Sequence, residues 1–165
     1  MGPFLAGQRL GRPWVVGKWA MTLDGRIATR TGHAAWITGE AARRDGRAWR
    51  SRLGAVMVGI GTVLADDPLL TVRDDTAGEP PTQPVRVVLD TQARLPATAR
   101  LLDPATLAAS PLLVAVGERA ATAARVQALE AAGATVWRMP QGADGRVDLA
   151  AVLARLAREQ GVMGG

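Results

Sequence analysis

The sequence predicts an α/β protein with a largely parallel β-sheet that helices cover on both faces. Short, continuous apolar runs recur along the chain, as they do in strands that are buried on both faces. Stretches with helical periodicity alternate with these runs, and this order of elements produces a parallel sheet. The chain has 165 residues, of which 48% are hydrophobic and 21% charged, which suffices for one domain with a core.

The first half of the chain is expected to contain two strands and one helix. Residues 14–20 and 55–60 are predicted to be strands, the second of them of the buried parallel kind. Residues 39–53 are predicted to form a helix with Thr38 as its N-cap. Turns or loops are expected at three places: Leu23–Gly25, Asp66–Pro68 and 76–84.

The second half is more regular. Strands are predicted at 85–90, 112–117 and 135–138, with an irregular, proline-containing segment between the first two. A helix is predicted at 120–132, with Gly133 at its C′ position. A last helix is expected to begin after Asp148 and to carry one apolar stripe, formed by Leu149, Val152, Leu153 and Leu156.

The composition excludes several kinds of site. The chain has no cysteine and one histidine, His33, so no cysteine- or histidine-based metal centre, disulfide framework or histidine-based triad is expected. The net charge is +5, but the basic residues are spread along the chain, which favours a phosphorylated small molecule over nucleic acid. We find no apolar run of membrane-spanning length and no signal-peptide pattern, and therefore expect a soluble, cytoplasmic protein without a membrane partner.

Few residues are candidates for chemistry. Lys18, the only lysine, lies within the first predicted strand, where it either polarises a carbonyl or imine or simply faces solvent. The segment Gly59–Gly61 follows a strand as in a dinucleotide-binding turn, but Leu64 stands where that motif has its third glycine. Asp66 and Asp67 could act as an acid–base pair, hold a metal, or open a turn.

One long block of the sequence resembles a known family. Residues 18–28, KWAMTLDGRIA, resemble the K-x-A-x-S-L-D-G-x-x-A signature of the riboflavin-biosynthesis pyrimidine reductase, the C-terminal reductase half of a bifunctional deaminase–reductase. The similarity runs without gaps from Arg12 to Arg73 and more loosely to Thr91. It includes the segments VGIGTVLADDP at 58–68 and PVRVVLDT at 84–91.

This resemblance implies a dihydrofolate-reductase-like fold, in which a mostly parallel sheet is flanked by helices and NADPH meets the substrate in one cleft. The implied reaction is the reduction of 5-amino-6-(5-phosphoribosylamino)uracil to its ribitylamino product, with hydride passing from the nicotinamide to C1′ of the sugar. Catalytic roles fall on Lys18 and Asp66. Cofactor contacts fall on Ala20, Trp36, Thr62, Asp66 and Thr91. Substrate contacts fall on Arg50, Leu70 and Arg73, of which the arginines suit a 5′-phosphate.

The sequence departs from the family in two respects. Ala34 stands where the family often has a substrate-binding serine, a loss of about 0.5–1.5 kcal/mol in binding. The family also continues beyond Gly165 with a glutamate and a glycine-rich loop that holds the pyrophosphate. We therefore expect residues 13–165 to be a reductase domain that is incomplete at its C-terminus, and the 165-residue chain alone to bind NADPH poorly and to be inactive. Residues 1–12 resemble an interdomain linker or N-terminal arm.

Two other functions stay open from the sequence. One is a paralogous reductase that acts on a diaminopyrimidinone or a pterin, because the residues that recognise the base are not placed. The other is a non-catalytic remnant. The resemblance also implies a homodimer, in which the reductase is fused to a deaminase domain, paired with one, or separate.

Overall fold

The four strands of the sheet are those that the apolar runs predict. The structure is a computed structural model, and it describes residues 13–32, 34, 37–72 and 82–161. Within this part of the chain one sheet has the order β1-β2-β3-β4, and all neighbouring strands are parallel. The strands are β1 Ala55–Gly59, β2 Val85–Leu89, β3 Leu112–Gly117 and β4 Thr135–Met139. The predicted α/β class with a parallel sheet is therefore confirmed.

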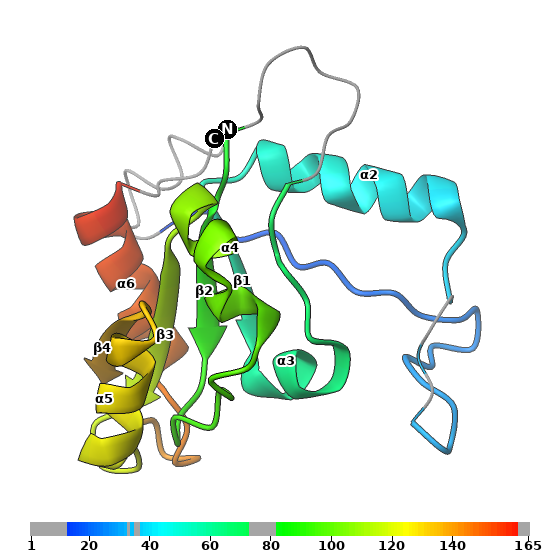
Figure 1. Cartoon of the computed structure of the whole chain (residues 1–165). Coiled ribbons are helices and arrows are strands. Elements are labelled where there is room, and N and C mark those ends of the chain that lie inside the picture. The colour runs from blue at the N-terminus through cyan, green and yellow to red at the C-terminus, as the bar shows by residue number, and fades with distance from the viewer. Residues whose placement is uncertain (1–12, 33, 35–36, 73–81, 162–165) are drawn as a thin grey trace.

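Helices lie on both faces of this sheet (Figure 1). Helices α3, α4 and α5, together with the 3-10 turn η1, contribute to the core on one face, and α6 contributes to the core on the other. Helix α2 precedes β1 and extends away from the sheet (Figure 1). The bounds are α2 Glu40–Ser51, α3 Ile60–Asp66, η1 Arg100–Leu102, α4 Pro104–Ala109, α5 Ala123–Ala131 and α6 Leu149–Gln160.

The longer predicted helices are confirmed, and their ends have local causes. The Asp148 carboxylate accepts hydrogen bonds from the first turn of α6, which makes it the predicted N-cap. Gly133 has a φ of +94° just beyond α5, as a C′ glycine does. Three residues of the predicted α6 stripe are buried against the sheet, whereas Leu149 is 48% exposed. The shorter α3, η1 and α4 were not predicted, because such short elements show no clear periodicity.

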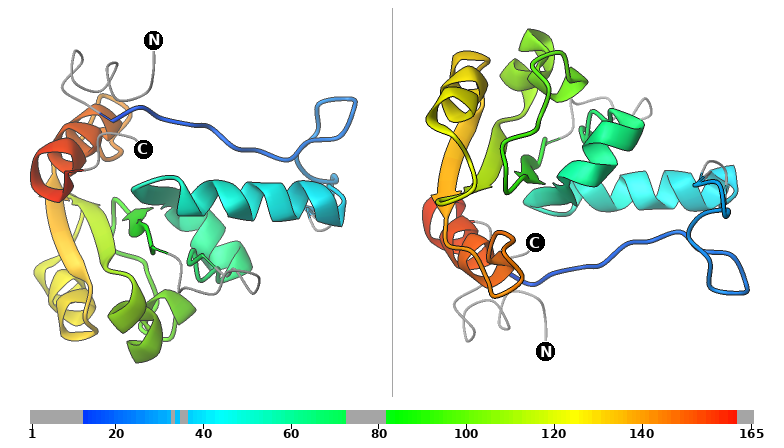
Figure 2. Two further views of the ribbon diagram at one scale, coloured as in Figure 1. Left: turned by 90° about the horizontal axis from the view of Figure 1, so that it is seen from above. Right: turned by 90° about the horizontal axis from the view of Figure 1, so that it is seen from below.

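The predicted strand at 14–20 is wrong. These residues form no strand, and they belong to an extended N-terminal segment that runs beside α2 (Figure 2). Trp14 is 42% exposed and Trp19 68% exposed. Apolar composition favours a strand only where another strand takes up its backbone hydrogen bonds, and no such pairing involves this segment among the described residues. The turn predicted after it is confirmed by a 2.9 Å hydrogen bond from Gly25 N to Thr22 O.

The predicted cap of α2 is also wrong. Gly39 occupies the N-cap position and makes no side-chain cap. Thr38 instead contributes its carbonyl oxygen, which accepts a hydrogen bond from the Arg43 guanidinium. The donor in this hydrogen bond is the side chain of Arg43. The contact therefore holds the start of α2 to Thr38, but it does not cap the free backbone N–H groups of the first turn.

A buried arginine connects β2 to the elements that follow it. Arg86 is fully buried, and its guanidinium donates to the carbonyl oxygens of Leu101 at 3.0 Å and Ser110 at 2.6 Å. It also donates to the Ser110 hydroxyl at 3.2 Å, and that hydroxyl donates to Pro84 O at 2.6 Å. Burial lowers the pKa of Arg86 to about 10, so it stays protonated at neutral pH.

Helices long and apolar enough to cross a bilayer are absent from the described part of the chain.

Candidate functional site

Three of the predicted cofactor-contacting residues lie at one edge of the sheet. Because all four strands are parallel, their carboxyl ends meet there, which is where α/β sheets bind ligands. Thr62 lies in the first turn of α3, just after β1, and Asp66 is the last residue of that helix. Thr91 follows β2 by two residues. Thr62 and Asp66 are exposed, and Thr91 is half-buried.

The backbone at the turn from β1 to α3 is accessible. A methyl group placed on Gly59 or on Gly61 would meet no other atom within 4 Å. The two glycines therefore leave free space beside the chain, next to the Thr62 hydroxyl. Accessible backbone and hydroxyl groups are what the ribose and amide parts of a nicotinamide cofactor require, so these residues fit such a group.

The neighbouring aspartates have separate environments. Asp67 ends α3 in the left-handed conformation, with a φ of 39°, and its Oδ1 accepts a 2.9 Å hydrogen bond from Arg100 N. Its carboxylate thus holds the end of α3 to η1, which leaves the exposed Asp66 as the aspartate that faces solvent. The described residues contain no group of three or more acidic, histidine or cysteine side chains that could hold a metal ion. The left-handed Asp67 fits the turn interpretation, whereas the role predicted for Asp66 stays a prediction.

Two predicted site residues, Lys18 and Arg50, lie at one face of helix α2. Arg43, Gly46 and Arg50 are the half-buried positions of this helix, and their spacing places them on one face. A methyl group on Gly46 would lie 3.5 Å from Cε of Lys18, so the lysine stem lies against this face. Arg50 is one turn further along, and its Nη1 donates to Thr71 O at 3.4 Å. The two cations that the sequence singles out therefore meet at one face of α2: Arg50 is part of this face, and the stem of Lys18 lies against it.

Two more predicted residues flank this group. Ala20 is half-buried two residues beyond Lys18. Leu70 is 4% exposed, and its side chain is part of the core, with a φ of +58°. Because its side chain is taken up by the core, only the backbone of Leu70 is available to a ligand. Its left-handed conformation is uncommon for leucine and marks a strained backbone at this position.

The predicted residues thus form two groups. Arg50 lies just before the amino end of β1, whereas Thr62, Asp66 and Thr91 lie at the carboxyl edge, about 13 Å away along that strand. Trp36 and Arg73, for which cofactor and substrate contacts were predicted, lie outside the described residues, as do His33 and residues 1–12.

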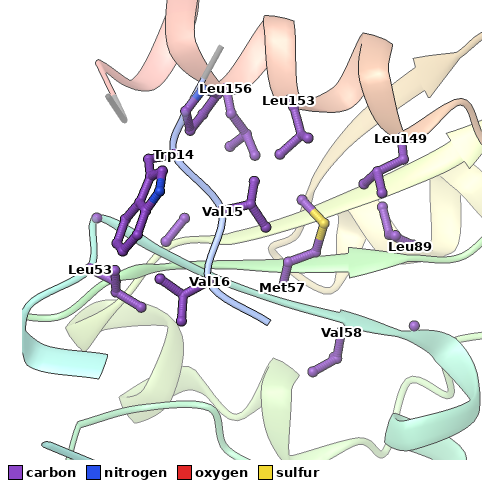
Figure 3. A pocket seen from close by; sticks show the side chains of 14 residues that line it. Trp14, Val15, Val16, Leu53, Met57, Val58, Leu89, Leu149, Leu153 and Leu156 are labelled. Atoms are coloured by element: carbon purple, nitrogen blue, oxygen red, sulfur yellow. The ribbon is translucent and has the colours of Figure 1, made fainter. Parts of the chain in front are cut away.

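The sequence did not reveal an apolar groove between the N-terminal segment, β1 and α6 (Figure 3). Its volume is about 280 Å³, and its lining carries no charged or hydroxyl-bearing side chain. The groove therefore offers no acid, base or nucleophile. The residues that line it most prominently are Trp14, Val15, Val16, Leu53, Met57, Val58, Leu89, Leu149, Leu153 and Leu156.

The sequence also gave no sign of the residues that support Thr91. The Thr91 hydroxyl accepts a 3.2 Å hydrogen bond from Val147 N, and the Thr91 carbonyl accepts one of 3.0 Å from Gly117 N. Val147 lies 56 positions along the chain from Thr91, and no local motif indicates that the two meet.

The chain is similar to proteins of known families. The family described as the RibD C-terminal domain matches residues 13–163. The riboflavin biosynthesis protein RibD of Bacillus amyloliquefaciens is 48% identical over 99 residues, which are 60% of this chain and 26% of that protein.

Solved structures give the same result. The RibD structure of Acinetobacter baumannii, form 1, superposes with a TM-score of 0.77 at 36% identity and covers 98% of this chain and 41% of its own. A Thermotoga maritima structure, named as a diaminohydroxyphosphoribosylaminopyrimidine deaminase/5-amino-6-(5-phosphoribosylamino)uracil reductase, has a TM-score of 0.70 at 28% identity and covers 98% and 40%. The chain therefore spans less than half the length of these relatives. The predicted dihydrofolate-reductase-like fold is confirmed by these neighbours.

Proposed function

Since this chain belongs to the RibD C-terminal domain family, we propose that it acts as an NADPH-dependent reductase of 5-amino-6-(5-phosphoribosylamino)uracil in riboflavin biosynthesis. The family that the 18–28 signature predicted is thereby confirmed. The observation that carries the proposal is the position of Lys18 against α2, one turn from Arg50. Two cations at one helix face suit a phosphorylated sugar.

On the substrate side, the two cations have different tasks. Arg50 presents a planar guanidinium that matches the oxygen geometry of a 5′-phosphate, with Arg73 as a second contact. Lys18 is the catalytic residue at the sugar: its ammonium stabilises negative charge on ribose oxygens and delivers a proton as the ring opens. Leu70 contributes through its backbone, because its side chain is buried.

On the cofactor side, Thr62 and Thr91 offer hydroxyl groups at the carboxyl edge, and the open backbone at Gly59 and Gly61 permits close approach. Asp66 presents a carboxylate beside them, as a hydrogen-bond acceptor and as the second proposed catalytic group. Further cofactor contacts are proposed for Ala20 and Trp36. NADPH, when bound, supplies the hydride.

The same proposal includes the setting of the enzyme. We place it in the cytoplasm as a homodimer, fused to or paired with a deaminase that supplies its substrate. The Thermotoga maritima relative, whose name combines a deaminase and a reductase, supports this arrangement. Gel filtration with light scattering of the full gene product tests the dimer.

The reaction itself is tested by following NADPH absorbance. The full gene product is mixed with NADPH and the phosphoribosylamino substrate, and we expect oxidation that depends on both. A substrate without its 5′-phosphate should react about ten- to a hundredfold less efficiently, because a charge-assisted contact is lost. Equal rates with and without the phosphate would contradict the role of Arg50, and no oxidation at all would contradict the proposed function.

A further inference from the structure

The segment from Pro140 to Asp148, called the 140–148 turn below, folds back on itself at the carboxyl end of β4. Gln141 and Val147 form an antiparallel bridge, and Asp148 N donates to Pro140 O at 2.9 Å. Gly142 N donates to Arg146 O at 2.9 Å inside the turn. The turn is therefore a unit closed by hydrogen bonds between its two arms.

Gln141 holds this unit in place. Its Nε2 donates to Gly145 O at 2.6 Å, across the turn. Its Oε1 accepts a 3.1 Å hydrogen bond from Arg119 N, which follows β3. One amide side chain thus fixes the inside of the turn and ties it to the neighbouring strand end.

The turn reaches Thr91, which is proposed above to contact the cofactor. Val147 N donates to Thr91 Oγ1 at 3.2 Å, and Gly117 N fixes the Thr91 carbonyl at 3.0 Å. A hydroxyl that accepts one hydrogen bond still has its own hydrogen to donate. With the Val147 amide on the acceptor side, the Thr91 hydrogen is left for a different acceptor.

We propose that the 140–148 turn is a positioning element, which orients the Thr91 hydroxyl as a donor to an oxygen atom of NADPH. This inference rests on the proposed function, because it takes the cofactor site to be at the carboxyl edge. Val147 and Gln141 touch neither cofactor nor substrate in this account. They act through Thr91.

Gly117 lies where the turn and Thr91 meet, and it has no room for a side chain. A methyl group there would lie 2.8 Å from Cδ of Gln141 and 3.0 Å from Cγ2 of Thr91. Both distances are too short, so an alanine displaces the turn, Thr91 or both. Gly117→Ala is therefore a way to disturb the position of the Thr91 hydroxyl without removing it.

The test measures the NADPH dissociation constant and the KM of the pyrimidine substrate in the full gene product. Gly117→Ala should weaken NADPH binding about five- to tenfold, as expected for one misplaced hydrogen bond, and leave the substrate KM within about twofold. Thr91→Val removes the hydroxyl but keeps Cγ2. If the turn acts through this hydroxyl, Gly117→Ala should change NADPH affinity by less than about twofold when it is added to Thr91→Val.

A matched control is Gly39→Ala, because a methyl group on Gly39 meets nothing within 4 Å. It should leave NADPH binding unchanged. Thermal unfolding of each variant separates loss of fold from loss of positioning, since only positioning through Thr91 predicts that Gly117→Ala has no further effect on NADPH affinity in the Thr91→Val background.

Three results would overturn the inference, and they are distinguishable. If Gly117→Ala lowers stability but not NADPH affinity, or if it weakens NADPH binding as much in Thr91→Val as in the unmodified protein, the turn does not act through Thr91, and the proposed function stands. If the unmodified gene product shows no saturable NADPH binding, the proposed function itself is wrong, and the inference fails with it.

Discussion

The N-terminal region, residues 13–54, and the region from β2 to α6 differ in how they use apolar side chains. From β2 to α6, residues such as Val87, Val114 and Val152 are fully buried. In the N-terminal region α2 buries no residue, and Trp19 is 68% exposed. Stability is therefore concentrated in the second region, whereas the cations proposed to bind substrate lie in the first. The difference teaches that the proposed substrate chemistry and the core can be altered separately.

The strongest test of this comparison is a pair of substitutions in the two regions. Leu156 lies on the buried face of α6 and is 1% exposed, so Leu156→Ala should lower the unfolding free energy of the protein by about 3 kcal/mol, because a cavity remains. Trp19→Ala should change the unfolding free energy by less than about 0.5 kcal/mol. Urea unfolding followed by circular dichroism measures both. A large loss for Trp19→Ala would show that the N-terminal segment is packed in solution and would break the comparison.

Lys18→Met should lower turnover about 100-fold in the full gene product, as loss of one electrostatic donor does, with unfolding free energy unchanged because Lys18 is exposed. Steady-state kinetics at saturating substrate measures it. Lys18→Arg is the control that keeps the charge and should retain part of the activity. Unchanged turnover in Lys18→Met would mean that Lys18 simply faces solvent and takes no part in catalysis.

Arg50→Ala should raise the dissociation constant of the phosphorylated substrate about ten- to thirtyfold and leave that of NADPH nearly unchanged. Arg44→Ala is the matched control, since Arg44 is an exposed arginine that lies off the Arg43–Gly46–Arg50 face of the same helix. Calorimetric titration with each ligand decides the result. Equal losses for both ligands would mean that Arg50 holds the fold through Thr71 and does not bind phosphate.

The smallest expected effect concerns the turn at Thr22–Arg26. The Thr22 hydroxyl donates to Asp24 at 2.5 Å, and this hydrogen bond is the main cause that lowers the pKa of the Asp24 carboxyl. The stability that follows from a lowered carboxyl pKa is present above the unfolded-state pKa and is lost as the pH falls through the folded-state value. Thr22→Ala should raise the pKa of Asp24, as NMR titration of the carboxyl carbon would show. An unchanged pKa would assign the lowering to the backbone hydrogen bond at Asp24 and to Arg26 instead.

The sequence predicted those parts of the fold that depend on neighbours along the chain. The apolar runs of β2 and β3 and the cap at Asp148 are of this kind, and all were found. The strand expected at 14–20 failed because a strand also requires a partner, which lies elsewhere in the chain. Helix α3 was missed because seven residues show too little periodicity.

For the candidate site, the family signature predicted which residues to examine but not how they lie. That Lys18 rests against Gly46, next to Arg50, depends on how the N-terminal segment runs along α2. That the Leu70 side chain belongs to the core, and that Val147 supports Thr91, depends on contacts between distant positions. Such contacts follow from packing and leave no local pattern in the sequence.

The central proposal is that this chain contributes Lys18, Arg50 and the carboxyl edge of its sheet to the site in which hydride passes from NADPH to the sugar of a phosphoribosylaminopyrimidine. The most direct measurement uses NADPH that carries deuterium at the transferable position of its nicotinamide, with the full gene product and 5-amino-6-(5-phosphoribosylamino)uracil. Our account predicts a ribitylamino product with a single deuterium, at C1′, in the mass and NMR spectra, and much slower labelling with Lys18→Met. A product without deuterium, label at another carbon, or NADPH left unconsumed would contradict it.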